Sequence, residues 1–126
     1  MTDPRLYIIM REDLWDMNPG KGMAQSAHAQ ALFDAYTPDV MGDYGKHYSA
    51  WAEDRGFGVT LVLSAPKSEW MDIQNGVQHY GYVTDPTYPY RNYYGKMFVT
   101  SEDTCMWVFA VTDEEIEHMH QWDLHK

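Results

Sequence analysis

Cysteine, basic residues and long apolar runs are scarce in this chain of 126 residues. Cys105 is the only cysteine, so no internal disulfide can form, which is compatible with a reducing compartment. No apolar run approaches the roughly 20 residues that cross a bilayer, and residues 1–5, MTDPR, lack the pattern of a signal peptide. We therefore expect a cytoplasmic protein that does not enter a membrane.

Basic residues are few: 9 Lys and Arg stand against 19 Asp and Glu, and the net charge is −10. Tight binding of a long polyanion ordinarily needs a basic surface. We expect no binding to DNA. Contact with RNA would have to use a local patch formed by Lys21 and Arg11 together with Arg91 or Lys96.

Apolar content, by contrast, is ample. Hydrophobic residues make up 44% of the chain and aromatic residues 15%, which excludes intrinsic disorder. The length fits one domain, residues 1–126, that can bury a core. The pattern of apolar residues predicts strands over Leu6–Met10, Phe57–Leu63, Tyr80–Asp85 and Cys105–Val111. It predicts helices from Pro19 to about Tyr36, over Tyr44–Arg55, from Lys67 to about His79 and after Thr112.

This succession predicts an α/β fold with the order β-α-α-β-α-β-β-α. We expect one four-stranded mixed sheet with helices on both faces. Asn18 and Pro19 suit the cap and the first position of a helix, and Thr112 with Glu115 forms a capping-box pattern. Residues 86–96 contain two prolines, a glycine and four tyrosines, so we expect a loop there.

Two segments carry a resemblance. Residues 10–14, MREDL, precede residues 17–29, MNPGKGMAQSAHA. They resemble the opening of the archaeal and eukaryotic type of peptidyl-tRNA hydrolase, in which a strand ends in Arg-x-Asp-Leu and a helix follows with Met-x-x-Gly-Lys-x-x-Ala-Gln-x-x-His-Ala. Near the C-terminus, Asp85, then Thr104 at the start of a strand, then the acidic residues 113–115 occur in the order found in that family.

The chain also differs from the family pattern. The family has Asp-Ala-Gly where this chain has Asp85-Pro86-Thr87, so Thr87 is the stand-in for a threonine that follows the aspartate. The segment between Asp85 and Thr104 is longer and rich in tyrosine. Pro19 stands where a basic residue is frequent.

The resemblance implies hydrolysis of the ester that joins a peptide to the terminal ribose of tRNA, without a cofactor. The chain shows no Ser-His-Asp or Cys-His order, so direct attack by water is expected. Lys21 at the helix start would bind phosphate or stabilise the oxyanion, Asp85 would orient or activate the water, and Thr104 would hold that water or a ribose hydroxyl. The residues expected at the substrate are Arg11, Gln25, His28, Thr87 and Arg91.

Each assignment has a structural alternative. Lys21 can be a solvated residue near a helix start, Asp85 a turn residue before proline and Thr104 simply a good strand former. Gln25 can bond a loop carbonyl, and His28 can pack within the helix. The tyrosines at 88, 90, 93 and 94 can stack on bases, or they can cover the domain or form a homodimer contact.

Two further interpretations concern metals and binding. His118, His120 and His125 with Cys105 do not have the spacing of a zinc site, and we expect no metal. The competing function is a non-catalytic module of the same fold that binds a small nucleotide or a protein partner. The acidic balance favours that module, whereas the presence of Lys21, Asp85 and Thr104 favours the enzyme acting on the 3′ end of tRNA or on a related aminoacylated nucleotide.

Overall fold

The elements follow one another in the predicted order β-α-α-β-α-β-β-α. The computed structural model describes residues 3–14, 17–36, 38, 42–56, 58–91 and 94–125. The elements are β1 (Arg5–Arg11), α1 (Pro19–Ala35), α2 (Tyr44–Glu53), β2 (Thr60–Ala65), α3 (Trp70–Asn75), β3 (His79–Arg91), β4 (Met97–Ala110) and α4 (Asp113–Met119). Short 3₁₀ turns follow α2 at Asp54–Gly56 and precede α3 at Lys67–Glu69.

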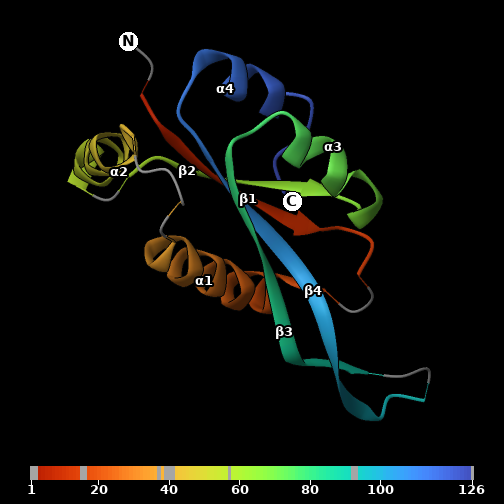
Figure 1. Ribbon diagram of the computed structural model, residues 1–126. Helices are drawn as coiled ribbons and strands as arrows, with labels where there is room; N and C mark the ends of the chain where they lie inside the picture. The colour runs from red at the N-terminus through yellow and green to blue at the C-terminus, as the bar shows by residue number, and fades with distance from the viewer. Residues whose placement is uncertain are drawn as a thin grey trace.

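One mixed sheet with the strand order β2-β1-β4-β3 forms the middle layer (Figure 1). β1 runs parallel to β2 and antiparallel to β4, and β3 is antiparallel to β4. β1 and β4 are therefore central, and β2 and β3 are the outer strands. Leu124 forms an antiparallel bridge with Leu63, so the C-terminal segment covers the outer edge of β2.

The alternation along β1 divides the core into two parts, as expected for a sheet buried on both faces. Leu6, Ile8 and Met10 pack with Phe33 of α1 and Trp51 of α2. On the opposite face the core is formed by side chains of β1, β2, β4, α3 and α4: Tyr7, Ile9, Leu63, Ala65, Trp70, Ile73, Met106, Val108, Ala110, Ile116 and Met119. The predicted fold, with helices on both faces, is confirmed.

Both predicted helix starts are confirmed. The Asn18 side chain accepts a hydrogen bond from the backbone N–H of Lys21, and Pro19 is the first residue of α1. Thr112 and Glu115 form the expected capping box of α4. Glu115 also accepts a hydrogen bond from the Gln78 backbone at 2.8 Å, so the cap ties α4 to the start of β3. Among the described residues, none of the helices combines the length and apolarity that a bilayer crossing needs.

A predicted strand and a predicted helix differ from the structure in their bounds. The strand expected from Phe57, which lies outside the described residues, begins at Thr60 and continues through Ala65. It passes the expected end at Leu63 because β1 continues beside it and pairs Arg11 with Ala65. The helix expected to reach His79 ends at Asn75.

Gly76 caps the end of that helix, and its lack of a side chain is needed for packing. A Cβ atom at Gly76 would lie 2.3 Å from the ring of His118, so only glycine allows α4 to approach so closely. His79, expected in the helix, is instead the first residue of β3.

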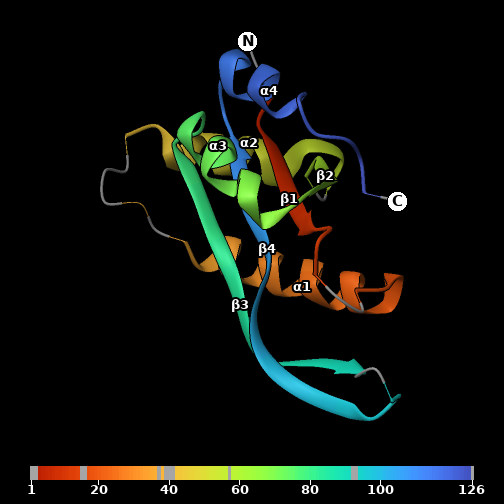
Figure 2. The ribbon, with the colours of Figure 1, turned by 90° about the vertical axis from the view of Figure 1, so that its right-hand side faces the viewer.

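The loop expected at residues 86–96 is largely a hairpin arm, formed by the ends of β3 and β4. β3 runs through both prolines to Arg91, and β4 begins at Met97, eight residues before the expected Cys105. Prolines are tolerated because β3 is an edge strand, where a missing N–H leaves no ladder bond unmade. Register shifts next to Asp85 absorb the irregularity. The arm extends beyond the sheet and curves toward the side on which α1 begins (Figures 1 and 2).

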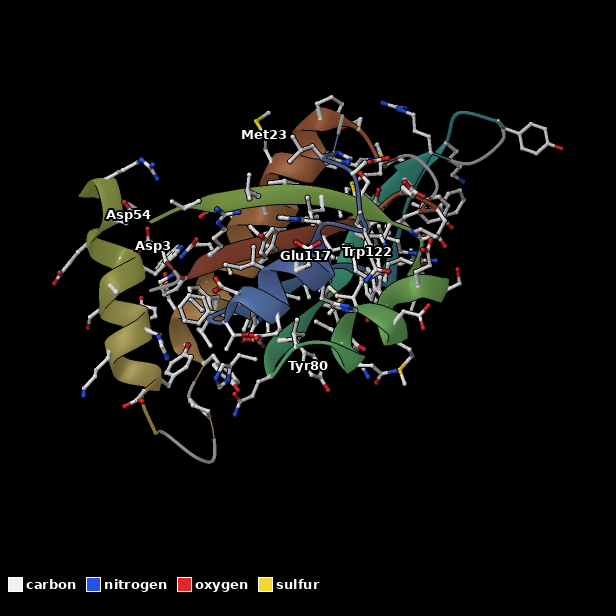
Figure 3. The ribbon with its side chains drawn as sticks, turned by 90° about the horizontal axis from the view of Figure 1, so that it is seen from above. Asp3, Met23, Asp54, Tyr80, Glu117 and Trp122 are labelled. Carbon is white, nitrogen blue, oxygen red and sulfur yellow. The ribbon has the colours of Figure 1, made fainter. Side chains whose placement is uncertain are left out.

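Phe33 is expected to carry much of the packing of α1. It is fully buried, and its ring lies 4.9 Å from that of Phe109 and 5.1 Å from that of Trp51, centroid to centroid. Phe33→Ala should lower the free energy of unfolding by about 3–5 kcal/mol, measured by urea denaturation. Met23→Ala on the same helix is the control, since Met23 is 70% exposed (Figure 3) and should change stability by less than about 0.5 kcal/mol. Equal losses would contradict this account of the core.

Candidate functional site

A buried amide on α1 joins two of the predicted residues. Gln25, 3% exposed, donates from Nε2 to Asp85 Oδ2 at 2.8 Å and accepts at Oε1 from the hydroxyl of Thr104 at 2.6 Å. The orientation of the amide is fixed by chemistry, because an ionised carboxylate can only accept and so must face the NH₂ group. Gln25, Asp85 and Thr104 therefore form one chain of hydrogen bonds between α1, β3 and β4.

The carboxylate of Asp85 is held at both oxygens. Besides the bond from Gln25, Oδ1 accepts from the backbone N–H of Thr87 at 2.8 Å and from its hydroxyl at 3.1 Å. Burial acts to raise the pKa of Asp85, but the hydrogen bonds from Gln25 and Thr87 and the nearby His28 outweigh it, and the pKa is lowered. Asp85 is thus an ionised, oriented acceptor, and it is at the same time a turn residue of the kind that often precedes proline.

Asp85 lines an open hollow between α1 and the edge strand β3. The hollow has a volume of about 400 Å³. It is lined by His28, Ala31, Leu32, Val83, Thr84, Asp85, Pro86 and Thr87, and is called here the Asp85 hollow. His28 is exposed and faces this hollow, so it is not packed in the helix interior. A water or a small polar group in the hollow has direct access to the carboxylate.

Thr104 was predicted to hold a water or a ribose hydroxyl, but its side chain does not reach the surface of the site. Its side chain is completely buried, and its hydroxyl bonds Gln25, with a second acceptor, the Val83 carbonyl, at 3.5 Å. In this arrangement Thr104 acts on the site through Gln25, as a positioning residue. Cys105 lies beside it, and its thiol donates to the Gln25 carbonyl at 3.5 Å. Burial raises the pKa of Cys105 to about 12, which leaves the thiol protonated and a poor nucleophile.

Lys21 lies one helical turn before Gln25 on the same stripe of α1. Its ammonium is above the ring of Tyr88, 5.3 Å from the centroid, a geometry in which the ring's negative face attracts the cation. Tyr88 is almost fully buried and follows Thr87, which binds Asp85. Lys21 is therefore partly buried, with its ammonium group over the Tyr88 ring next to the turn at Asp85.

The other cations of the predicted patch are distributed unevenly. Arg11 binds Asp13 at 3.0 Å and Glu102 at 3.2 Å, so its charge is compensated by two carboxylates. Arg91 lies on the hairpin arm, where it donates to the Gly95 carbonyl at 3.1 Å. Lys96 lies over the ring of Phe98, 5.6 Å from its centroid. Arg11 is thus held in ion pairs on β1, whereas Arg91 and Lys96 lie on the hairpin arm.

A second, smaller hollow is lined by Tyr88. Its volume is about 260 Å³, and it is lined by Leu14, Tyr88, Tyr90, Thr100 and Glu102; it is called here the Tyr90 hollow. The sequence reasoning missed Glu102 and Leu14. A signal did exist for Glu102: it alternates with Thr100 and Thr104 along one strand, and residues at this spacing share a face.

No protein-family model matches this chain, and no curated protein matches it. The site therefore rests on its own geometry. Among the described residues, no three His, Cys, Asp or Glu side chains gather in a way that would hold a metal ion.

Gln25 should control the acidity of Asp85. In Gln25→Leu the amide donor is lost and the pKa of Asp85 should rise, as followed by an NMR titration of its carboxyl carbon. Because the pKa of Asp85 is lowered in the folded state, the stability it contributes is present above its unfolded pKa and is lost as the pH falls through its folded pKa.

The matched control is Gln30→Leu. Gln30 lies on the same helix but bonds Asp34 at 3.1 Å, so this change should leave the Asp85 titration where it is. An Asp85 pKa that is the same in wild type and Gln25→Leu would rule out the bridge.

Proposed function

We propose that this protein hydrolyses an ester between an acyl group and the terminal ribose of an RNA, as in peptidyl-tRNA or a related aminoacylated nucleotide. The observation that supports it best is the Gln25 bridge, which holds an ionised Asp85 at an open hollow with Lys21 one turn away on the same helix. The resemblance of residues 10–29 to peptidyl-tRNA hydrolases points to the same chemistry.

The reaction we envisage needs no covalent intermediate. A water in the Asp85 hollow donates a hydrogen bond to Asp85 and attacks the ester carbonyl carbon. The bond from that carbon to the ribose oxygen then breaks, the ribose oxygen takes up a proton and the acyl group leaves as a carboxylic acid. Asp85 mainly orients the water, because a carboxylate with a lowered pKa is a weak base.

Lys21 supplies the positive charge in this proposal. Its ammonium would stabilise the oxyanion that develops on the carbonyl oxygen, or grip the adjacent phosphate. Gln25 and Thr104 act as positioning residues that hold Asp85. His28 lines the hollow and contacts the acyl or ribose part of the substrate.

A second candidate function has one observation in its favour. Arg11 is neutralised by Asp13 and Glu102, so less positive charge surrounds the site than the sequence pattern implied. A non-catalytic module that binds a small nucleotide or a protein partner needs less positive charge than an enzyme that binds tRNA. Binding of an RNA end without hydrolysis would favour this alternative.

Lys21→Ala should lower kcat by about 10²–10³, the cost of removing one group that stabilises an oxyanion. The assay is hydrolysis of a defined N-blocked aminoacyl-tRNA. His28→Ala should cost less, because His28 lines the hollow without being assigned to the developing charge. Lys46→Ala, a side chain 88% exposed on α2, is the control and should behave as wild type. Equal losses in Lys21→Ala and His28→Ala at preserved stability would mean that the roles are assigned wrongly.

Binding to the intact RNA should depend only weakly on salt. With a net charge of −10, the protein can use few cations, and each phosphate neutralised on a single strand adds about 0.7 to the slope of log K against log salt concentration. Contacts from Lys21, Arg91 and Lys96 would give a slope of about 2. A filter-binding titration across salt concentrations measures it. A slope several times steeper would indicate recognition of the tRNA body and would contradict recognition of its end.

A further inference from the structure

The hairpin arm differs in charge from the rest of the molecule. Residues 86–101 include Arg91 and Lys96 but no Asp or Glu, in a chain whose net charge is −10. The segment therefore has a net charge of +2 and does not repel a polyanion, unlike the acidic remainder of the chain. Its exposed large hydrophobic side chains are Tyr94, Met97, Phe98 and Val99.

One face of the arm presents a row of rings. Tyr90 pairs with Phe98 across the two strands, and their rings stack with centroids 5.8 Å apart. Tyr88 is two residues from Tyr90 and lies on the same face of the strand. Lys96 lies over Phe98 at one end of the row, and Lys21 lies over Tyr88 at the other. The row therefore leads from the arm to the predicted catalytic lysine.

The Tyr90 hollow interrupts this row between Tyr90 and Tyr88. At about 260 Å³ it holds far more than one water, whose share of volume is about 30 Å³. Tyr88, Tyr90, Leu14 and Thr100 line it together with Glu102. Flat walls with one polar edge suit a planar heterocycle better than a flexible chain.

Glu102 gives the hollow a defined polarity. Its Oε2 accepts from Arg11 at 3.2 Å, and within the part of the chain that the structure describes Oε1 has no hydrogen-bond partner. The side chain is only 31% exposed. A carboxylate accepts hydrogen bonds and cannot donate them, so a ligand must offer an N–H or O–H group at this point.

We propose that the Tyr90 hollow binds one base of a single-stranded RNA and that Glu102 makes it prefer cytosine to uracil. The two bases have the same size, but cytosine presents an amino group where uracil presents a carbonyl oxygen. When position 4 of the base lies at Oε1 of Glu102, the amino group of cytosine donates to it, whereas the carbonyl oxygen of uracil at the same place is repelled. The inference rests on the proposed function only in taking RNA as the substrate.

The test uses fluorescence anisotropy with labelled oligo(C) and oligo(U) of equal length at one salt concentration. Wild type should bind oligo(C) about tenfold more tightly, the effect of one good contact to a base edge. Glu102→Gln should remove or reverse the preference, because the amide oxygen must face the donor on Arg11 and its NH₂ group then faces the base. Tyr90→Ala should weaken both oligonucleotides about tenfold by removing a stacking ring.

Matched controls separate the hollow from general effects. Glu53→Gln changes an exposed carboxylate on α2, and Tyr80→Ala changes an exposed tyrosine at the opposite end of β3 from the arm (Figure 3). Both should bind as wild type does. Thermal melting shows whether Glu102→Gln still folds after losing its partner Arg11. If it does not, wild type and Tyr90→Ala still test whether the hollow binds a base and prefers cytosine.

Equal binding of oligo(C) and oligo(U) by wild type, absence of binding to either, or unchanged binding by Tyr90→Ala would each overturn the proposal. These outcomes are independent of the esterase, since neither oligonucleotide carries an ester. Hydrolysis without a base preference defeats only this inference. A base preference without hydrolysis defeats only the proposed enzyme.

Discussion

The arrangement of the site depends on a single buried amide. Gln25 can satisfy both ends of its side chain only if α1 lies across β3 and β4 so that Asp85 meets its nitrogen and Thr104 its oxygen. A buried polar group left without a partner costs about 1–3 kcal/mol, so this pairing selects one placement of the helix on the sheet. The same contact that orders the packing also fixes the carboxylate, and stability and the chemistry of the hollow are therefore linked.

Charge is organised around that contact in two ways. At the end of β1, Arg11 forms ion pairs with Asp13 and Glu102, and Lys67 forms one with Asp103. The hydrogen bond from Lys67 is the main cause of the lowered pKa of Asp103. This network is neutral enough to be structural. On the arm, Lys96 lies over the ring of Phe98, whose negative face attracts the ammonium group.

The sequence was sufficient for the order of elements and the two helix caps, because these depend on local signals: apolar periodicity, Asn18 before Pro19, and Thr112 with Glu115. It was insufficient where a neighbour decides the outcome. Pro86 and Pro89 indicate a loop by themselves, yet at a sheet edge they fit a strand. Thr104 was expected to face the substrate, and its burial depends on a partner 79 residues away. The hollow with Glu102 forms only once the arm has folded.

The two outer edges of the sheet are closed by different means. The edge of β2 is occupied by residues 123–125, through the Leu63 bridge to Leu124 and backbone bonds at Ser64 and His125. The edge of β3 contains Pro86 and Pro89, which have no N–H to offer to a further strand. Neither edge therefore favours growth of the sheet from one copy of the chain to the next. The prolines in and after the turn at Asp85 therefore also disfavour edge-to-edge pairing of β3 with another copy of the chain.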